Sequence, residues 1–196
     1  MALDGTLIAE ENNSRMKYIA FILLAGFGMN QAGGESYVSK NARISLYSKA
    51  PLEDIEAVSG KGVSVLNTTT GAVAFTVPIK SFQFDKSLMQ EHFNENYMES
   101  DKFPNASFKG KIQEKFDISR AGTYPVRAVG VLEVHGVKQN RTITGTIIVN
   151  KNTVRLTSEF TVQCKDHKIE IPRLVFQKIA ESIQVKVSTD YTNYQK

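Results

Sequence analysis

The sequence predicts an all-β fold built from antiparallel strands. Apolar and polar residues alternate at period two along most of the chain that follows its apolar N-terminal stretch, which is typical of strands with one buried face. Turn signals at 59–62, 70–71, 121–122, 136 and 150–152 separate these runs. The connections are too short for the helical crossovers that parallel strands need. Such a sheet hides its apolar face by closing into a barrel or folding into a sandwich.

The clearest predicted strand covers residues 154–163. Val154, Leu156 and Phe160 face one side there, while charged and hydroxyl residues occupy positions on the other. Residues 126–135 are less regular, because apolar residues stand on both faces. In chain order, the predicted strands are 44–46, 73–77, 108–112, 126–135, 143–147, 154–163 and 183–187. The buried face is expected to contain Phe75, Phe108, Ile143, Leu156, Phe160 and Val185.

Two stretches interrupt the strand pattern and favour helix. Residues 85–100 are rich in Leu, Met, Gln and Glu, and Asp85 is placed to cap a helix there. Residues 172–181 predict a second short helix before the last strand.

Residues 1–32 are predicted to be a leader that does not join the domain. A lone basic residue precedes a short apolar run at 18–28, which is the arrangement of a secretory signal peptide and too short to span a membrane. Small residues follow, and we expect cleavage after Ala32. Residues 1–15 are interpreted as an upstream start-site artefact, with Met16 as the true start. A buried N-terminal element and an uncleaved membrane anchor are the alternatives.

The remaining chain, residues 33–196, is expected to be one domain that acts in the periplasm or after secretion. The full sequence has a net charge of +4 without an Arg/Lys block, so nucleic-acid binding is not predicted. Its single cysteine, Cys164, excludes an intramolecular disulfide, and we expect it to be a small core residue. No segment after the leader is apolar over a length that predicts stable membrane insertion.

The sequence offers little that predicts catalysis. His92, His135 and His167 share no spacing typical of metal ligands, so each is either a structural histidine or a contact to a ligand head group. There is no Gly-x-Ser-x-Gly elbow and no His-Glu-x-x-His helix. We therefore predict a protein that is not an enzyme and has no metal site.

Aromatic residues gather in one part of the chain. Phe82, Phe84, Phe93, Tyr97, Phe103 and Phe108 lie close together in the sequence, interleaved with Leu88, Met89 and Met98. They form either an ordinary core or the adaptable wall of a cavity at a barrel mouth. Composition leaves both interpretations open.

Three segments resemble the YceI-like family. A His-Phe pair at 92–93 precedes a Phe-Pro-x-Ala-x-Phe strand start at 103–108, and residues 130–138 match the family's Gly-x-Leu-x-x-His-Gly-Val strand and turn. The third segment is the closing stretch 160–187. Together these segments and the strands between them cover most of residues 40–191, in the order and spacing of the family.

The resemblance implies an eight-stranded antiparallel, lipocalin-like β-barrel with one or two short helices. It also implies a non-catalytic, often periplasmic protein that holds an isoprenoid, quinone-like or fatty-acid-derived amphiphile in the barrel, with no other cofactor. Residues 48–54 and 85–99 depart from the usual pattern, so the ligand's identity is not carried over from relatives. The alternative is a β-domain with a filled core that contacts another protein.

The expected partner is thus a small apolar or amphiphilic ligand. The sequence does not decide whether the chain also forms a homodimer. His92, Tyr97 and His135 are candidates for contact with its head group. The predicted ligand-binding residues are Phe75, Phe82, Phe84, Leu88, Met89, His92, Phe93, Tyr97, Met98, Phe108, His135, Leu156, Phe160 and Phe176.

The leader generates the first testable prediction. N-terminal sequencing of the protein from its native source is expected to begin near Gly33, because the small residues there suit a signal peptidase. Recovery of a polypeptide that still carries residues 1–15 would contradict both the start-site interpretation and the processing.

Overall fold

The computed structural model describes residues 35–49, 54–151, 153–171 and 181–193. The expected leader and nearly all of the expected second helix, 172–181, lie outside the described residues. The strands are β1 (Ser36–Ser48), β2 (Ile55–Asn67), β3 (Ala72–Pro78), β4 (Gln83–Phe84), β5 (Asn105–Ile112), β6 (Gly122–Val134), β7 (Val137–Val149), β8 (Val154–Gln163) and β9 (Ser182–Asn193). The helical segments are η1 (Ile79–Ser81), α2 (Ser87–His92), η2 (Phe93–Tyr97) and η3 (Cys164–His167).

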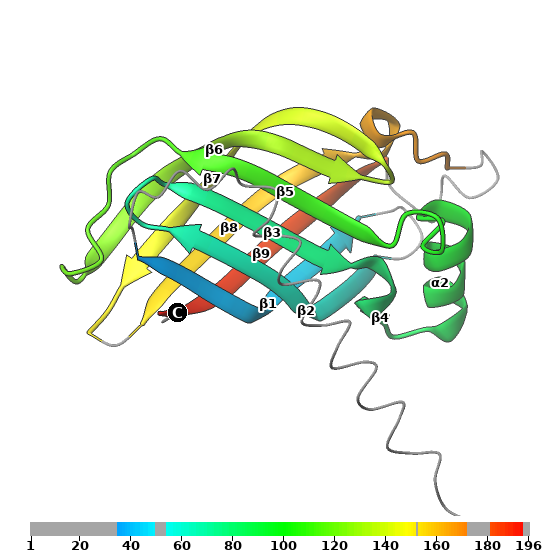
Figure 1. Ribbon diagram of the computed structural model, residues 1–196. Coiled ribbons are helices and arrows are strands. Elements are labelled where there is room, and N and C mark those ends of the chain that lie inside the picture. Colours follow the sequence, from blue (N-terminus) through cyan, green and yellow to red (C-terminus); the bar gives the residue numbers. More distant parts are fainter. Residues whose placement is uncertain (1–34, 50–53, 152, 172–180, 194–196) are drawn as a thin grey trace, which may run out of the picture. The chain divides into compact units, whose positions relative to one another are not determined.

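The strands form a closed antiparallel barrel. Their order is β1-β9-β8-β7-β6-β5-β3-β2, and a further pairing of β1 with β2 closes the circle (Figure 1). The two-residue strand β4 pairs with the start of β2 and adds a short ninth strand to the sheet. The prediction of an eight-stranded antiparallel barrel is confirmed.

β1 and β2 bend sharply at the point where the barrel closes. The register of β1 against β2 shifts on both sides of Ala42, which marks a bulge that curves the strand. A Cβ added at Gly62 would lie 2.4 Å from the Ile44 side chain and 2.8 Å from the Ala42 carbonyl oxygen. The turn predicted at 59–62 is therefore wrong. Its glycines lie inside β2, where a close approach of two backbones requires a residue without a side chain.

The inner face of the barrel holds the apolar residues that alternation predicted. The irregular pattern at 126–135 also has a simple explanation. Val126 and Leu132 are buried inside, whereas Val129 and Val131 point outward with 48% and 36% of their surface exposed. Apolar residues on both faces of β6 thus reflect two exposed valines on one strand.

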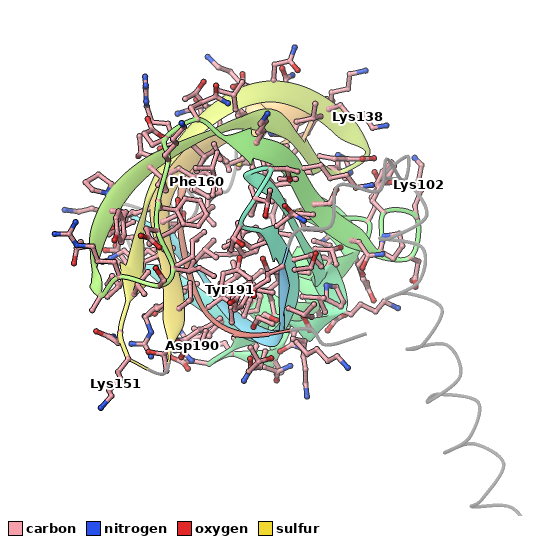
Figure 2. All side chains as sticks on the ribbon, turned by 60° about the vertical axis from the view of Figure 1, so that its left-hand side comes forward. Lys102, Lys138, Lys151, Phe160, Asp190 and Tyr191 are labelled. Carbon is pink, nitrogen blue, oxygen red and sulfur yellow. The ribbon has the colours of Figure 1, made fainter. Side chains whose placement is uncertain are left out.

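Tyr191 fills the end of the barrel that lies away from α2. Its hydroxyl lies 2.6 Å from Ser64 Oγ, and Ser64 Oγ donates to the Ala74 carbonyl oxygen at 3.0 Å. Because Ser64 has one proton, Tyr191 is the donor to Ser64. Burial raises the pKa of Tyr191, so the phenol stays neutral. Figure 2 shows Tyr191 and Phe160 inside the barrel and Lys138 and Lys151 pointing outward.

The first expected helix is present but shorter than predicted, and Asp85 does not cap it. Lys86 occupies the N-cap position without a side-chain cap bond, because β4 keeps the chain extended through Phe84. After six residues the helix widens into a π-helical turn. Asn94 Nδ2 donates to the Gln90 carbonyl oxygen at 2.8 Å, a side-chain bond that competes with helical pairing.

The glycine pair Gly110–Gly130 generates a stability prediction. These residues are direct partners between β5 and β6, and a Cβ at Gly130 would lie 2.2 Å from the Lys109 carbonyl oxygen and 2.4 Å from Gly110 Cα. We expect Gly130→Ala to lower the free energy of unfolding by about 1–3 kcal/mol, measured by denaturant titration, because backbone must move. Gly60→Ala is the matched control, since nothing lies within 4 Å of its added Cβ. Equal stability of the two variants would contradict this account.

Candidate ligand-binding cavity

The barrel encloses a cavity of about 600 Å³. All eight barrel strands contribute inward-facing side chains to its wall, and most of these are aliphatic or aromatic. The volume lies within the range of small-molecule sites, which are typically apolar with a few placed polar groups. Side chains therefore do not fill the interior completely, and a cavity remains.

The helical segments α2 and η2 cover one end of the cavity, and we call them the cover (Ser87–Tyr97). Figure 1 shows α2 beside one end of the barrel. Phe93 packs on Phe82 and Phe84, with ring centroids 5.8 and 5.0 Å away, so an aromatic cluster holds the cover in place. Leu88 also lines the cavity, although 60% of its surface is exposed. The cover is thus the boundary between the cavity and the solvent at this end.

The four ionisable side chains of the described lining lie toward the end of the barrel at which the cover lies. Lys86, His92 and Tyr97 belong to the cover or precede it, and burial raises the pKa of Tyr97. The fourth is Cys164, whose pKa burial raises to about 11, so the thiol remains protonated at neutral pH and is a poor nucleophile. The expectation of a small core residue at Cys164 is confirmed by its burial.

Hydroxyl groups deeper in the wall are engaged by the barrel itself. Ser158 Oγ donates to the Thr144 carbonyl oxygen at 2.6 Å, and Thr76 Oγ1 donates to the Ala106 carbonyl oxygen at 3.4 Å. A molecule that fits this arrangement has an apolar body within the barrel and its polar group near the cover.

Twelve of the fourteen predicted residues line the cavity. Phe176 lies outside the described residues. His135 does not line the cavity, so the structure does not bring it together with His92 and Tyr97. The twelve lining residues are Phe75, Phe82, Phe84, Leu88, Met89, His92, Phe93, Tyr97, Met98, Phe108, Leu156 and Phe160.

His135 lies at a corner where three segments meet. Its Nε2 is 2.8 Å from a carboxylate oxygen of Glu99, and its Nδ1 is 3.1 Å from the His167 carbonyl oxygen. The Phe103 ring packs edge-on, 4.5 Å away. Both partners are acceptors, so both bonds form only when the imidazole carries two protons. The bond from His135 is the main reason why the pKa of Glu99 is lowered.

The backbone at this corner adopts uncommon angles. His135 and Gly136 form the two-residue turn between β6 and β7, with φ of 51° and 70°, as a type I′ hairpin turn requires. A Cβ at Gly136 would collide with the Phe103 ring at 2.5 Å. The His-Gly pair is thus explained by turn geometry and by its tie to Glu99, which joins the chain after the cover to the hairpin.

Sequence reasoning missed the aliphatic lining from β1 and β2. Leu46, Ile55 and Ala57 contribute to the wall, yet only 44–46 was predicted as strand in this region. Ile55 and Ala57 stand at period two on either side of Glu56, and the glycine-rich turn signal at 59–62 concealed the strand that contains them.

The structure contains few other features that would indicate a different class of protein. Among the described residues, no group of three or more His, Cys, Asp or Glu side chains is arranged to hold a metal ion. No helix in the described part of the chain has the length and apolar character needed to cross a membrane.

Comparisons with solved structures show the same fold in three bacterial proteins. A polyisoprenoid binding domain from Saccharophagus degradans, implicated in plant cell wall breakdown, aligns with a TM-score of 0.69 and 11% identity over 82% of this chain and 99% of that chain. BcnA of Burkholderia cenocepacia aligns with a TM-score of 0.66 and 15% identity over 77% and 96%. The YceI protein of Campylobacter jejuni aligns with a TM-score of 0.59 and 14% identity over 74% of this chain and 88% of that chain.

Sequence comparison gives a consistent result. No curated protein matches the chain. The family model for the YceI-like domain matches residues 50–191, which includes β2 to β8, the cover, the His135 corner and most of β9. The expectation of a protein that is not an enzyme agrees with this match. On this evidence the chain belongs to the YceI-like family.

Proposed function

We propose that this protein binds one long-chain amphiphile, with the apolar tail in the barrel and the polar end near the cover, and catalyses no reaction. The observation that carries the proposal is the apolar cavity of about 600 Å³. The structurally similar Saccharophagus degradans domain is described as polyisoprenoid binding, which supports a ligand of the isoprenoid, quinone-like or fatty-acid-derived class. The signal-peptide pattern at 18–28 supports action in the periplasm or after secretion.

Burial of the tail supplies enough free energy for binding without a charged partner in the wall. Each buried CH₂ group contributes about 0.8 kcal/mol, so ten such groups give roughly 8 kcal/mol before the entropic costs of association. The alternative of a protein-contact domain with a filled core does not fit a barrel that contains this volume.

Direct chemical analysis tests the proposal. Organic extraction of the natively purified protein, followed by mass spectrometry, is expected to release a long-chain amphiphile at a ratio approaching one per chain. Protein that is unfolded and washed before the same extraction is the control for adsorbed lipid. Folded protein that yields no amphiphile, and takes up none when fatty acids and isoprenoid alcohols are added, would overturn the proposal.

A matched pair of substitutions on β6 tests the position of the ligand. Ala128 lines the cavity, and the adjacent Val129 faces solvent. We expect Ala128→Phe to weaken binding of a fluorescent fatty acid at least tenfold, because the ring occupies ligand volume, with little change in melting temperature. Val129→Phe adds an aromatic ring on the outer face and is expected to leave affinity unchanged. Equal affinities for the two variants would place the ligand elsewhere.

A further inference from the structure

The barrel wall has one incomplete joint, between β7 and β8. Their pairing runs only from Gly145–Ser158 to Val149–Val154. Beyond that point β7 stays paired with β6 up to Val137, and β8 stays paired with β9 up to Gln163. Residues 137–144 and 159–163 therefore face each other without a backbone ladder, and we call this stretch the seam. Its two strands can be followed in Figure 1.

Side chains bridge the seam in place of backbone bonds. Arg141 Nη2 donates to the Thr161 carbonyl oxygen at 2.6 Å, in a contact that is exposed to solvent. At one end, Ser158 Oγ donates to the Thr144 carbonyl oxygen at 2.6 Å.

The other end of the seam is bridged to η3. Gln139 Nε2 donates to the Asp166 carbonyl oxygen at 2.8 Å, and His167 Nδ1 lies 3.1 Å from the Val137 carbonyl oxygen. Arg141 thus holds the middle of the seam by a single exposed bond.

The cavity lies directly behind the seam. Ile143 and Gly145 of β7 and Ser158, Phe160 and Val162 of β8 all line it. The β7–β8 ladder ends at Gly145 and Ser158, two of the smallest residues in the wall. Bulky side chains therefore do not block the point where the two strands separate. Arg141 lies two residues from Ile143, and its partner Thr161 follows Phe160, so their bond lies beside apolar residues of the cavity wall.

We propose that the seam is a side passage through which the apolar tail of the ligand enters and leaves, with Arg141 as its latch. This inference rests on the proposed function. Opening the middle of the seam breaks the exposed bond between Arg141 and Thr161, which water replaces easily, and leaves the part-buried bridges to η3 in place. Displacing the cover instead separates Phe93 from Phe82 and Phe84 and breaks the Glu99–His135 bond. The seam is therefore the joint that opens at the lower cost.

Exchange kinetics of an anthroyloxy-labelled fatty acid test the latch. Arg141→Met keeps the aliphatic stem but removes the donor, and we expect it to raise the association and dissociation rates together by about fivefold, which corresponds to about 1 kcal/mol in the barrier. The equilibrium Kd is expected to stay within about twofold of wild type. Arg155→Met is the matched control on the neighbouring strand β8, because Arg155 bonds Asp190 at 2.6 and 2.8 Å across the fully paired β8–β9 joint. Its rates are expected to match those of wild type.

A covalent bridge across the seam provides the converse test. In a Cys164→Ser background, Thr142→Cys and Thr161→Cys joined by a short bis-maleimide are expected to slow both rates at least tenfold. The control bridge joins Thr146→Cys and Thr157→Cys, which are ladder partners. Because the strands are already paired there, this bridge is expected to leave both exchange rates of the labelled fatty acid unchanged. Circular dichroism checks that both bridged proteins keep the fold.

The two possible failures are distinguishable. A wild-type protein that binds the probe, together with a seam-bridged variant that exchanges it at the wild-type rate, overturns the side passage and leaves the proposed function intact. A folded wild-type protein that binds neither the probe nor other long-chain amphiphiles overturns the proposed function, and the side passage with it.

Discussion

The pairing of β1 with both β2 and β9 closes the sheet, and this closure determines what every inward-facing side chain contacts. A closed barrel leaves no long unpaired edge and removes one face of eight strands from water. The bulge at Ala42 and the close approach at Gly62 are the local conditions for this closure. Without them the apolar faces of β1 and β2 would not meet those of β8 and β9, and no enclosed volume would exist.

The cavity follows from the way in which the two ends of the closed barrel differ. Tyr191 and the Ser64 hydroxyl fill one end with a hydrogen-bonded pair, so the phenol is buried without an unsatisfied hydroxyl. At the other end the covering element is a short helix that touches the barrel through Phe93. The Tyr191–Ser64 pair thus lies at one end and the aromatic contacts of the cover at the other. Between them the wall is mostly aliphatic, and its side chains leave a cavity. This distribution gives an interior that suits a tail with one polar end.

Much of this architecture was predictable from the sequence, and the failures have physical causes. Alternation at 154–163 and 143–147 correctly identified strands and their buried faces, because a half-buried strand imposes period two whatever its partners. It could not decide between a filled core and a cavity, since that depends on barrel diameter. Gly60 and Gly62 indicated a turn but belong to a bent strand. The role of His135 was not predictable, because its partner Glu99 is 36 residues away and the contact depends on how the cover ends.

The bonds at the His135 corner and at the seam differ in their exposure to solvent. The corner that anchors the chain after the cover relies on the imidazole of His135, whose side chain is 11% exposed, and loss of the Glu99 carboxylate would leave a largely buried ring nitrogen without that bond. The middle of the seam relies on one solvent-exposed hydrogen bond from the half-buried Arg141, which water can replace. Because it is largely buried, the His135–Glu99 bond costs more free energy to break than the exposed bond from Arg141. Under the proposed function, this difference in burial would leave the corner closed while the seam opens for the tail.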